Sequence, residues 1–526
     1  MESEHRSTRP RRLPWLLLSL LLLDLTLRLA VAFRPLEVID GRTIPDDAYL
    51  SLQIARNIAR GLGPWYTTAH TNGFQPLYVF LVVPAYWIFP QDLVAPIRAA
   101  LVLLTLFDVA SLWLLYRLVA SFSSSRLTPV VAAIAWIANP YVIRTTLNGL
   151  ETAVAAFFAL WALTVFRRLH RQQTLPSNGQ ALRLGAVVGL AVLARIDSIL
   201  LGAALAAVIL LENRTRWRGA LRRVAVMALA ASVVCVPWLV YSYAYTGDLY
   251  PVSGQAVRLV DLDNLRTAAP GFGNWYGPLL RSGLTTIWSC NWPLLVAIAI
   301  LGAMILPRQG RRPGYEPPRA LLAAAGLFAL FLLLAYVLHQ YGRWYFDRYL
   351  YPFCFVLILG LAVLFEAAAA RSRNGRLAQA AAIVVALVAA FALHGDRGRL
   401  TVAADRKNRL GYMQLGQWAA RTFPPGSVLG GSQSGALAYF APQLAVVNLD
   451  GVVNKDCYRS IVERRNQQYI VAAGIQQVIG WDINFSFIAR HTAHWDPDLM
   501  AEPHPIPDLE SWGNNWYAVA VRPNLR

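Results

Sequence analysis

Residues 13–33 read LPWLLLSLLLLDLTLRLAVAF, a stretch that is long and apolar enough to form a helix across a membrane. Comparable runs recur along the chain, which has 526 residues, 56% of them hydrophobic. This composition excludes an ordinary soluble protein and predicts a polytopic α-helical membrane protein. Apolar runs near the spanning length lie at 13–33, 98–118, 128–143, 150–168, 219–243, 291–306, 319–339, 348–370 and 377–394.

One further apolar stretch is broken in its middle. Residues 184–211 are too long for one regular span, and Arg195-Ile196-Asp197 interrupts them. We therefore expect two short helices that meet at a polar elbow, and a topology with about eleven transmembrane helices in total.

Positive charge is concentrated in short loops between the apolar runs. The net charge is +19, and the cytoplasmic loops of membrane proteins carry an excess of Lys and Arg. The charge therefore indicates topology and not binding to nucleic acid. The loops that we expect in the cytoplasm lie at 6–12, 167–171, 214–223, 308–319 and 371–376.

That topology divides the chain into a transmembrane module, 1–394, and an extracytoplasmic tail, 395–526. The first outer loop of the module is 34–97. A later outer loop, 244–290, mixes aromatic residues, Gly and Pro without a clear period, which is typical of a loop over a site. The tail is predicted to be a small α/β domain with strands near 427–431, 444–449, 475–481 and 516–521 and a helical stretch near 455–473.

Two apolar stretches could each be either a membrane span or another kind of segment. Residues 74–89 contain or adjoin Pro76, Pro84 and Pro90, and a crossing there would put 167–171 outside, so we expect a juxtamembrane or re-entrant segment. The first run could also belong to a cleaved signal peptide. Asp24 and Arg28 interrupt its core, so we expect a retained span.

Two adjacent carboxylates, Asp46 and Asp47, stand in the polar stretch after the first span. Ionised groups beside hydrocarbon are costly and are usually kept for function. The alternative is that they only favour the dipole of a helix N-terminus. Thr43 is the expected N-cap of this helix, and Gly61 or Gly63 its stop.

The same helix is amphipathic in sequence. Leu50, Ile54 and Ile58 recur every four residues, whereas Gln53 and Arg56, with their polar neighbours, fall on the other side. We expect the helix to lie along the membrane interface, with both aspartates at the boundary between lipid and water.

Further polar residues lie at the outer ends of the spans. Glu151 begins a span, and Arg195 and Asp197 form the elbow, where they could simply pair with each other. Near the later spans, polar residues follow a spacing of four, three and four, which places them on one face if the helix continues. They are Tyr336, Gln340, Arg343 and Asp347, with His339 and Arg348 close by.

A cationic group of this kind at a membrane surface suits a phosphate clamp, because a guanidinium binds phosphate oxygens in pairs. The alternative is an interfacial belt of Tyr, Trp and Arg. Together with the carboxylates, the group indicates a lipid-linked phosphate donor and a base that takes a proton from an incoming hydroxyl, as in sugar transfer. Whether Asp46 or Asp47 is that base stays open.

Several motifs resemble the GT-C class of integral-membrane glycosyltransferases, and within it the bacterial arabinofuranosyltransferases and, more distantly, the protein O-mannosyltransferases. The likeness extends over most of the chain. The motifs are Asp46-Asp47-Ala48-Tyr49, Asn57 with Gly61-Leu62-Gly63, Thr71-Asn72-Gly73-Phe74-Gln75-Pro76-Leu77, Asn148-Gly149-Leu150-Glu151-Thr152, Leu193-Ala194-Arg195-Ile196-Asp197 and Asn448-Leu449-Asp450-Gly451-Val452-Val453-Asn454.

The resemblance implies an inverting transfer from a polyprenyl-monophosphate sugar to a hydroxyl of a glycan, lipid or protein, outside the inner membrane of a bacterial cell. It implies a catalytic Asp46 or Asp47. Donor phosphate would be bound by Arg195, His339, Arg343 and Arg348, and substrate by Tyr49, Asn72, Gln75, Glu151 and Asp197.

Two points stay open within this resemblance. Many relatives have Pro where Ile196 stands, so the elbow departs from the pattern of the family at this position. Some members of the class use a divalent cation, and Mg²⁺ or Mn²⁺ could bind oxygens of Asp46, Asp47 and Glu151. The cysteines have no metal-type spacing, although a Cys290–Cys457 disulfide is conceivable.

The alternative function is a transporter or flippase of a lipid-linked saccharide. That reading requires polar residues through the bilayer midplane and internal repeats, and neither is evident in the sequence. A third reading is a sensor or assembly protein whose tail binds glycans.

Overall fold

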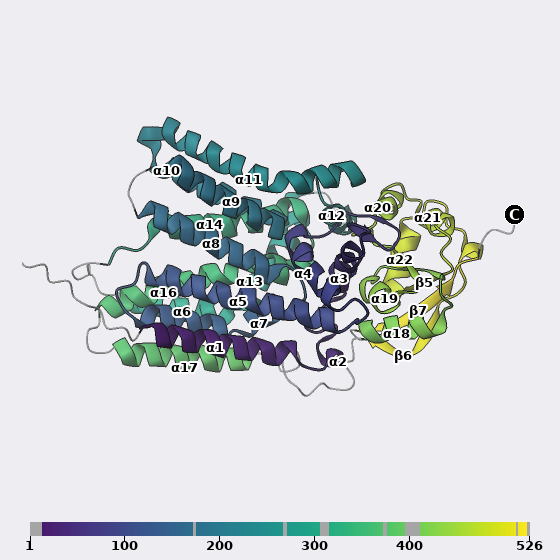
Figure 1. Ribbon diagram of the computed structural model, residues 1–526, viewed down its shortest axis with the longest axis horizontal. Coiled ribbons are helices and arrows are strands. Elements are labelled where there is room, and N and C mark those ends of the chain that lie inside the picture. The colour runs from purple at the N-terminus through teal and green to yellow at the C-terminus, as the bar shows by residue number, and fades with distance from the viewer. Residues whose placement is uncertain are drawn as a thin grey trace, which may run out of the picture.

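The computed structural model describes residues 13–171, 175–266, 271–305, 315–371, 376–394, 411–511 and 514–522. Long helices lie side by side in a bundle, and an α/β domain caps one end of it (Figure 1). The bundle helices are α1 (Leu13–Ala32), α5 (Ala95–Ala120), α6 (Leu127–Ile137), α7 (Pro140–Thr146), α8 (Thr152–His170), α9 (Asn178–Ala194), α10 (Ile199–Glu212), α11 (Trp217–Thr246), α13 (Phe272–Ile305), α14 (Arg319–Ala335), α16 (Pro352–Arg371) and α17 (Arg376–His394).

The helical membrane protein predicted from composition is confirmed. Within the described ranges, seven helices are long and apolar enough to cross a membrane, or eight if the bent pair α6 and α7 is one span. Three shorter apolar helices, Pro76–Ile88, Asn178–Ala194 and Ala378–Ala392, accompany them. The count of about eleven crossings stays a prediction.

Helix α1 is tied to the bundle by buried charges. Arg28 lies 2.6 Å from the carboxylate of Asp24 on its own helix and 2.6 Å from that of Asp108 on α5. All three side chains are fully buried. The two residues that interrupt the first apolar run therefore join α1 to α5, which gives them a structural role.

The predicted polar elbow is present. Helix α9 ends at Ala194, a short 3₁₀ turn η1 (Ile196–Ser198) follows, and α10 begins at Ile199. Arg195 caps α9 with an extended backbone, φ −160° and ψ 119°, so the chain leaves the helix at this residue. A second 3₁₀ turn, η2 (Arg214–Arg216), separates α10 from α11.

The segment 34–97, which was predicted to be the first outer loop, folds into α2 (Leu36–Ile39), α3 (Asp46–Ala59), a small hairpin of β1 (Trp65–Tyr66) and β2 (Ala69–His70), and α4 (Pro76–Ile88). The acidic helix α3 begins after Pro45, so the predicted cap at Thr43 is wrong. The proline ring fixes the backbone at the helix entry without a side-chain cap. Gly61, with φ +82°, follows its end as expected.

The polar face of α3 is not exposed at an interface. Gln53, Arg56 and Asn57 are all buried, because the tail domain covers this side of the helix. The guanidinium of Arg56 donates to the carbonyl of Tyr439 in the tail and lies 4.9 Å from its ring. The expectation of an interfacial helix is corrected: α3 is enclosed between the bundle and the tail.

Most of 244–290 is helical, so its description as a loop was wrong. It forms α12 (Val252–Arg266) and the beginning of α13. The polar face predicted after Tyr336 is also broken. A π-helical turn, η3 (Tyr336–Gln340), is followed by Tyr341 and Gly342, which both have positive φ and end the helix. The chain then forms two short elements, η4 (Arg343–Tyr345) and α15 (Phe346–Tyr349).

The tail has the predicted α/β fold, with a five-stranded sheet in the order β4-β3-β5-β7-β6. Strands β3, β4 and β5 are parallel, and β7 is antiparallel to β5 and β6. Strand β6 was not predicted. The elements are α18 (Tyr412–Thr422), β3 (Val428–Gly431), α19 (Gly435–Phe440), β4 (Ala445–Asn448), α20 (Lys455–Val462), α21 (Asn466–Ala472), β5 (Gln477–Gly480), α22 (Asp482–Arg490), η6 (Pro497–Leu499), β6 (His504–Ser511) and β7 (Asn514–Ala520).

The tail and the bundle share one apolar core. Helix α19 packs against α3, where the ring of Tyr49 lies 5.8 Å from that of Tyr439 and 5.3 Å from that of Phe440. Figure 1 shows α19 facing α3 at the junction. All four cysteines are buried and free, so the conceivable Cys290–Cys457 disulfide is not formed.

Candidate functional site

A cavity of about 340 Å³ lies at the end of the bundle that faces the tail. Its walls come from the start of α3, the segment before α4, the start of α8, the elbow, α12, η3 and α15. The lining is mixed: it includes the apolar side chains of Leu50, Phe74 and Leu200 as well as several charged groups. Such a mixed lining suits a ligand with both an apolar and an ionic part.

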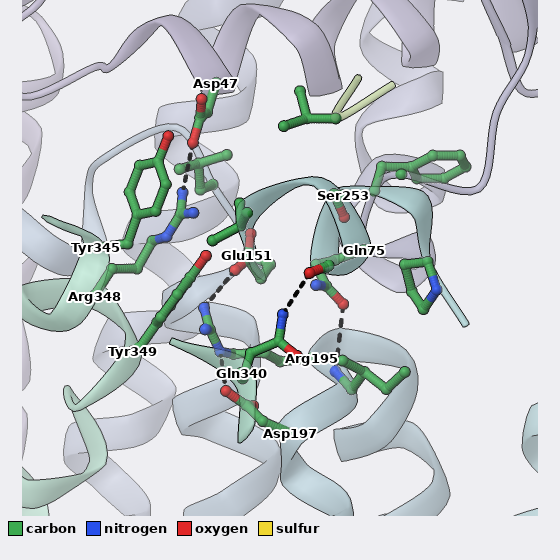
Figure 2. A pocket seen from close by; sticks show the side chains of 18 of the residues that line it. Asp47, Gln75, Glu151, Arg195, Asp197, Ser253, Gln340, Tyr345, Arg348 and Tyr349 are labelled. Carbon is green, nitrogen blue, oxygen red and sulfur yellow. Dashed lines mark hydrogen bonds and ion pairs between the residues drawn. The ribbon is translucent and has the colours of Figure 1, made fainter. Parts of the chain in front are cut away.

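Arg195 is the centre of one charged group. Its Nη1 lies 2.7 Å from Glu151 and its Nε 2.8 Å from Asp197, as Figure 2 shows. The hydroxyl of Tyr336 donates to Asp197 at 2.5 Å, and the guanidinium lies 4.9 Å from the ring of Tyr349. The two carboxylates together carry more charge than Arg195, so this group is an internal ion network with no excess positive charge. It is therefore poorly suited to bind a phosphate.

Asp47 and Arg348 form the second charged group. The carboxylate of Asp47 lies 3.4 Å from Nη1 of Arg348, and the two side chains face each other in Figure 2. The contact is longer than a strong charge-assisted hydrogen bond. Arg348 also lies over the rings of Tyr345 and Tyr349, at 5.1 and 5.4 Å. Its buried Nε has no hydrogen-bond partner in the described part of the chain.

The two adjacent aspartates point to different places. The carboxylate of Asp46 accepts hydrogen bonds of 2.9 Å from the backbone N–H groups of Gly435 and Ala436 in the tail. It does not line the cavity. Burial raises the pKa of Asp46 to about 7, although these two hydrogen bonds lower it. The nearby charges of Asp47 and Asp450 raise the pKa further. Of the predicted catalytic pair, the structure brings only Asp47 to the cavity.

Among the other predicted residues, Gln75 and His339 line the cavity, together with Glu151, Arg195, Asp197 and Arg348. Gln75 accepts a hydrogen bond of 3.3 Å from the backbone N–H of Ile196 and thereby joins the first outer loop to the elbow.

Besides Asp46, three predicted site residues lie outside the cavity. The hydroxyl of Tyr49 donates to Asp40 at 2.7 Å. The amide of Asn72 donates to Ser242 on α11 at 2.8 Å, and its oxygen accepts from the N–H of Val252. Arg343 pairs with Asp261 at 3.5 Å, because the chain reversal after Gln340 turns it away. Tyr49 and Asn72 therefore connect the segments around the site, whereas Arg343 forms an ion pair away from the cavity.

Sequence reasoning did not assign Tyr250, Ser253, Tyr345 and Tyr349, all of which line the cavity. Ser253 was missed because α12 was taken for an irregular loop, and Tyr250 lies in the short connection before that helix. The spacing of Tyr345 and Tyr349, four residues apart beside Arg348, was the available signal for the other two.

The tail contributes to the cavity as well. Val452, in the connection between β4 and α20, lines its wall, and its carbonyl oxygen lies so near Gly73 that a Cβ there would come within 2.0 Å. A second contact joins the tail to the bundle, because Lys455 at the start of α20 forms an ion pair of 2.6 Å with Asp248 after α11. Burial also raises the pKa of Asp450, in the same connection, to about 7.

The carboxylates do not form a metal site of the kind considered above. Asp46 is turned toward the tail, Glu151 is paired with Arg195, and Asp47 faces Arg348. Across the described ranges, no group of three or more His, Cys, Asp or Glu side chains could hold a metal ion. Mg²⁺ usually binds through only one or two carboxylates together with the phosphates of a substrate, so the use of a divalent cation stays a prediction.

Comparisons with known proteins agree with this architecture. The structure is similar to that of ArnT from Cupriavidus metallidurans bound to undecaprenyl phosphate, with a TM-score of 0.59, 13% identity and coverage of 96% of this chain and 98% of that one. It is also similar to the oligosaccharyltransferase AglB from Archaeoglobus fulgidus in complex with an inhibitory peptide and a dolichol-phosphate. For AglB the TM-score is 0.51 and the identity 14%, over 92% of this chain and 72% of that one.

Similarity in sequence covers smaller parts. GPI mannosyltransferase 1 from Eremothecium gossypii is 24% identical over 199 residues, which is 38% of this chain and 45% of the mannosyltransferase, so less than half of that relative's length is spanned. Residues 401–521 match a family model described as a domain of unknown function, DUF8728.

These neighbours are GT-C glycosyltransferases, and the chain has the GT-C fold. It is a multi-span membrane protein in which a GT-C-like helical module carries a C-terminal α/β domain.

Proposed function

We propose that this protein is a membrane glycosyltransferase. It moves a sugar from a polyprenyl-monophosphate donor to a hydroxyl group of a glycan, lipid or protein outside the inner membrane of a bacterial cell, with inversion at the anomeric carbon. The observation that carries the proposal is the 3.4 Å contact of Asp47 with Arg348 inside the cavity. A carboxylate and a cation are thus placed together in a cavity that also has apolar lining residues, which suits a lipid-linked phosphate.

The phosphate of the donor would bind at Arg348, whose Nε has no hydrogen-bond partner among the described residues and whose guanidinium lies over the rings of Tyr345 and Tyr349. Guanidinium groups bind phosphate oxygens in pairs. A phosphate at Arg348 competes with the long contact to Asp47 and leaves that carboxylate available. Support comes from ArnT and AglB, whose structures contain undecaprenyl phosphate and dolichol-phosphate.

The reaction follows from that arrangement. The acceptor hydroxyl attacks the anomeric carbon on the face opposite the phosphate, and Asp47 accepts its proton. The bond between the anomeric carbon and the phosphate oxygen breaks, and its electron pair leaves with the polyprenyl phosphate. Arg348 stabilises the charge that develops on this leaving group. Only one base is required in such a single displacement.

The test is sugar transfer by purified protein from a panel of polyprenyl-monophosphate sugars. Asp47→Asn is expected to lower transfer by about 100-fold or more, the usual contribution of a general base, while donor binding is retained. Arg343→Gln is the matched control, because Arg343 lies outside the cavity. Transfer that is unaffected by Asp47→Asn would refute the assigned base. Flipping of the donor without transfer by the wild type would favour the transporter.

A further inference from the structure

A second cavity, of about 270 Å³, lies between the C-terminal ends of α5 and α8. Helix α8 starts beside Glu151 at the first cavity and has 19 residues, so its other end is about 28 Å away at 1.5 Å per residue. The second cavity is therefore at the opposite end of the bundle. Its lining contains four arginines and two hydroxyl groups: Arg117, Arg167, Arg168, Arg171, Ser121 and Thr164.

The charge of these arginines is not compensated by the described part of the protein. None of the four forms an ion pair with a carboxylate there, and the nearby Glu212 pairs with His170 instead, at 3.1 Å. The Nε of Arg167 is buried without a hydrogen-bond partner in the same ranges. Two helix C-termini supply only about −0.5 charge each, which leaves roughly +3 in one cavity.

An apolar surface adjoins the cavity. Trp113 lies one turn before Arg117 on α5, and the guanidinium is 5.7 Å from its ring. Trp161 lies two turns before Arg168 on α8, on the same face. Both indoles are more than one-third exposed. Exposed indoles near the ends of membrane-spanning helices are suited to contact with lipids.

We propose that the cavity is a binding site for the phosphate of an anionic phospholipid, whose acyl chains lie against Trp113 and Trp161. Basic pockets between transmembrane helices are suited to lipid head groups because the guanidinium fork matches phosphate oxygens. The site is independent of the proposed transfer reaction, and it takes its ligand from the membrane leaflet opposite the first cavity.

The experiment is native mass spectrometry of the purified full chain after exchange into phosphatidylglycerol or phosphatidylcholine. Wild type is expected to retain phosphatidylglycerol, and Arg167→Gln/Arg171→Gln to lose it at least tenfold. The matched control is Arg216→Gln/Arg218→Gln, which removes the same charge from exposed residues at the same end of the bundle. The control should retain the lipid, and gel filtration checks the folding of both variants.

Three results would overturn the proposal. Equal loss in both double variants would mean that the arginines form only a general positive belt. Equal retention of phosphatidylcholine would exclude recognition of an anion. Displacement of phosphatidylglycerol by inorganic phosphate at a similar concentration would identify a soluble phosphate as the ligand. Sugar transfer is not part of the readout, so these results do not depend on the proposed function.

Discussion

The carboxylate of Asp46 accepts a 2.9 Å hydrogen bond from the backbone N–H of Gly435, a residue 389 positions later in the chain. This contact joins the helix that carries Asp47 to the carboxyl edge of the parallel strands in the tail. In open α/β sheets that edge usually holds a ligand. Here α3 occupies it, so the tail fixes the position of the first turn of α3 and, with it, of Asp47.

Because Gly435 packs closely against the backbone of Asp46, we expect Gly435→Ala to disturb the contact between the tail and α3. A Cβ at this position would lie 2.2 Å from the backbone oxygen of Asp46, so the tail or α3 must shift. We expect a loss of about 1–3 kcal/mol of stability, as for other overpacked sites, and reduced transfer. Thermal unfolding and transfer assays measure both. Gly326→Ala on α14 is the control, because its Cβ meets nothing within 4 Å; similar behaviour of both variants would contradict the prediction.

Stability at the junction should fall as pH rises from about 4 to about 7. The pKa of Asp46 is raised by burial from 3.8 to about 7, so in this interval the folded protein binds a proton that the unfolded chain has released. Asp46→Asn removes this titration. The melting temperature of wild type relative to Asp46→Asn should therefore be higher near pH 4 than near pH 8. A difference that does not change with pH would show that Asp46 titrates normally.

The two arginines of the cavity should behave differently when replaced. Arg348→Gln removes the proposed phosphate ligand and leaves only the partly exposed Asp47 unpaired, so the donor KM should rise with little change in stability. Arg195→Gln leaves Glu151 and Asp197 without their cation in a buried network. Loss of one partner there is expected to cost about 3–5 kcal/mol.

Thermal unfolding and initial-rate measurements on the two variants separate these effects. If Arg195→Gln unfolds at the wild-type temperature and only its donor KM rises, Arg195 is itself a phosphate ligand and its structural assignment fails.

Arg343→Gln is expected to leave donor KM unchanged. The side chain is half-exposed and pairs with Asp261 at 3.5 Å outside the cavity. The carboxylate of Asp261 is buried, but it also accepts hydrogen bonds from the backbone N–H groups of Gly342 and Arg343, at 2.6 and 3.2 Å. These bonds remain in the variant, so the melting temperature should fall only modestly. A several-fold rise in donor KM would mean that Arg343 moves into the cavity when the donor binds.

The sequence by itself determined the membrane class, the place of the elbow at Arg195 and the α/β character of the tail. These features depend on local patterns, namely hydrophobic run length and the alternation of apolar residues in strands. Local patterns also identified most of the charged residues of the cavity, because ionisable groups beside apolar runs are rare enough to stand out.

Only the tertiary structure separated Asp46 from Asp47, because it turns Asp46 toward the tail and brings Asp47 to the cavity. The two residues have the same chemistry and adjacent positions, and the backbone amides that bind Asp46 belong to a domain far away in the sequence. The same holds for Arg343, whose direction depends on a chain reversal at Tyr341 and Gly342. Side-chain direction is set by packing between distant segments, and a local pattern does not contain that information.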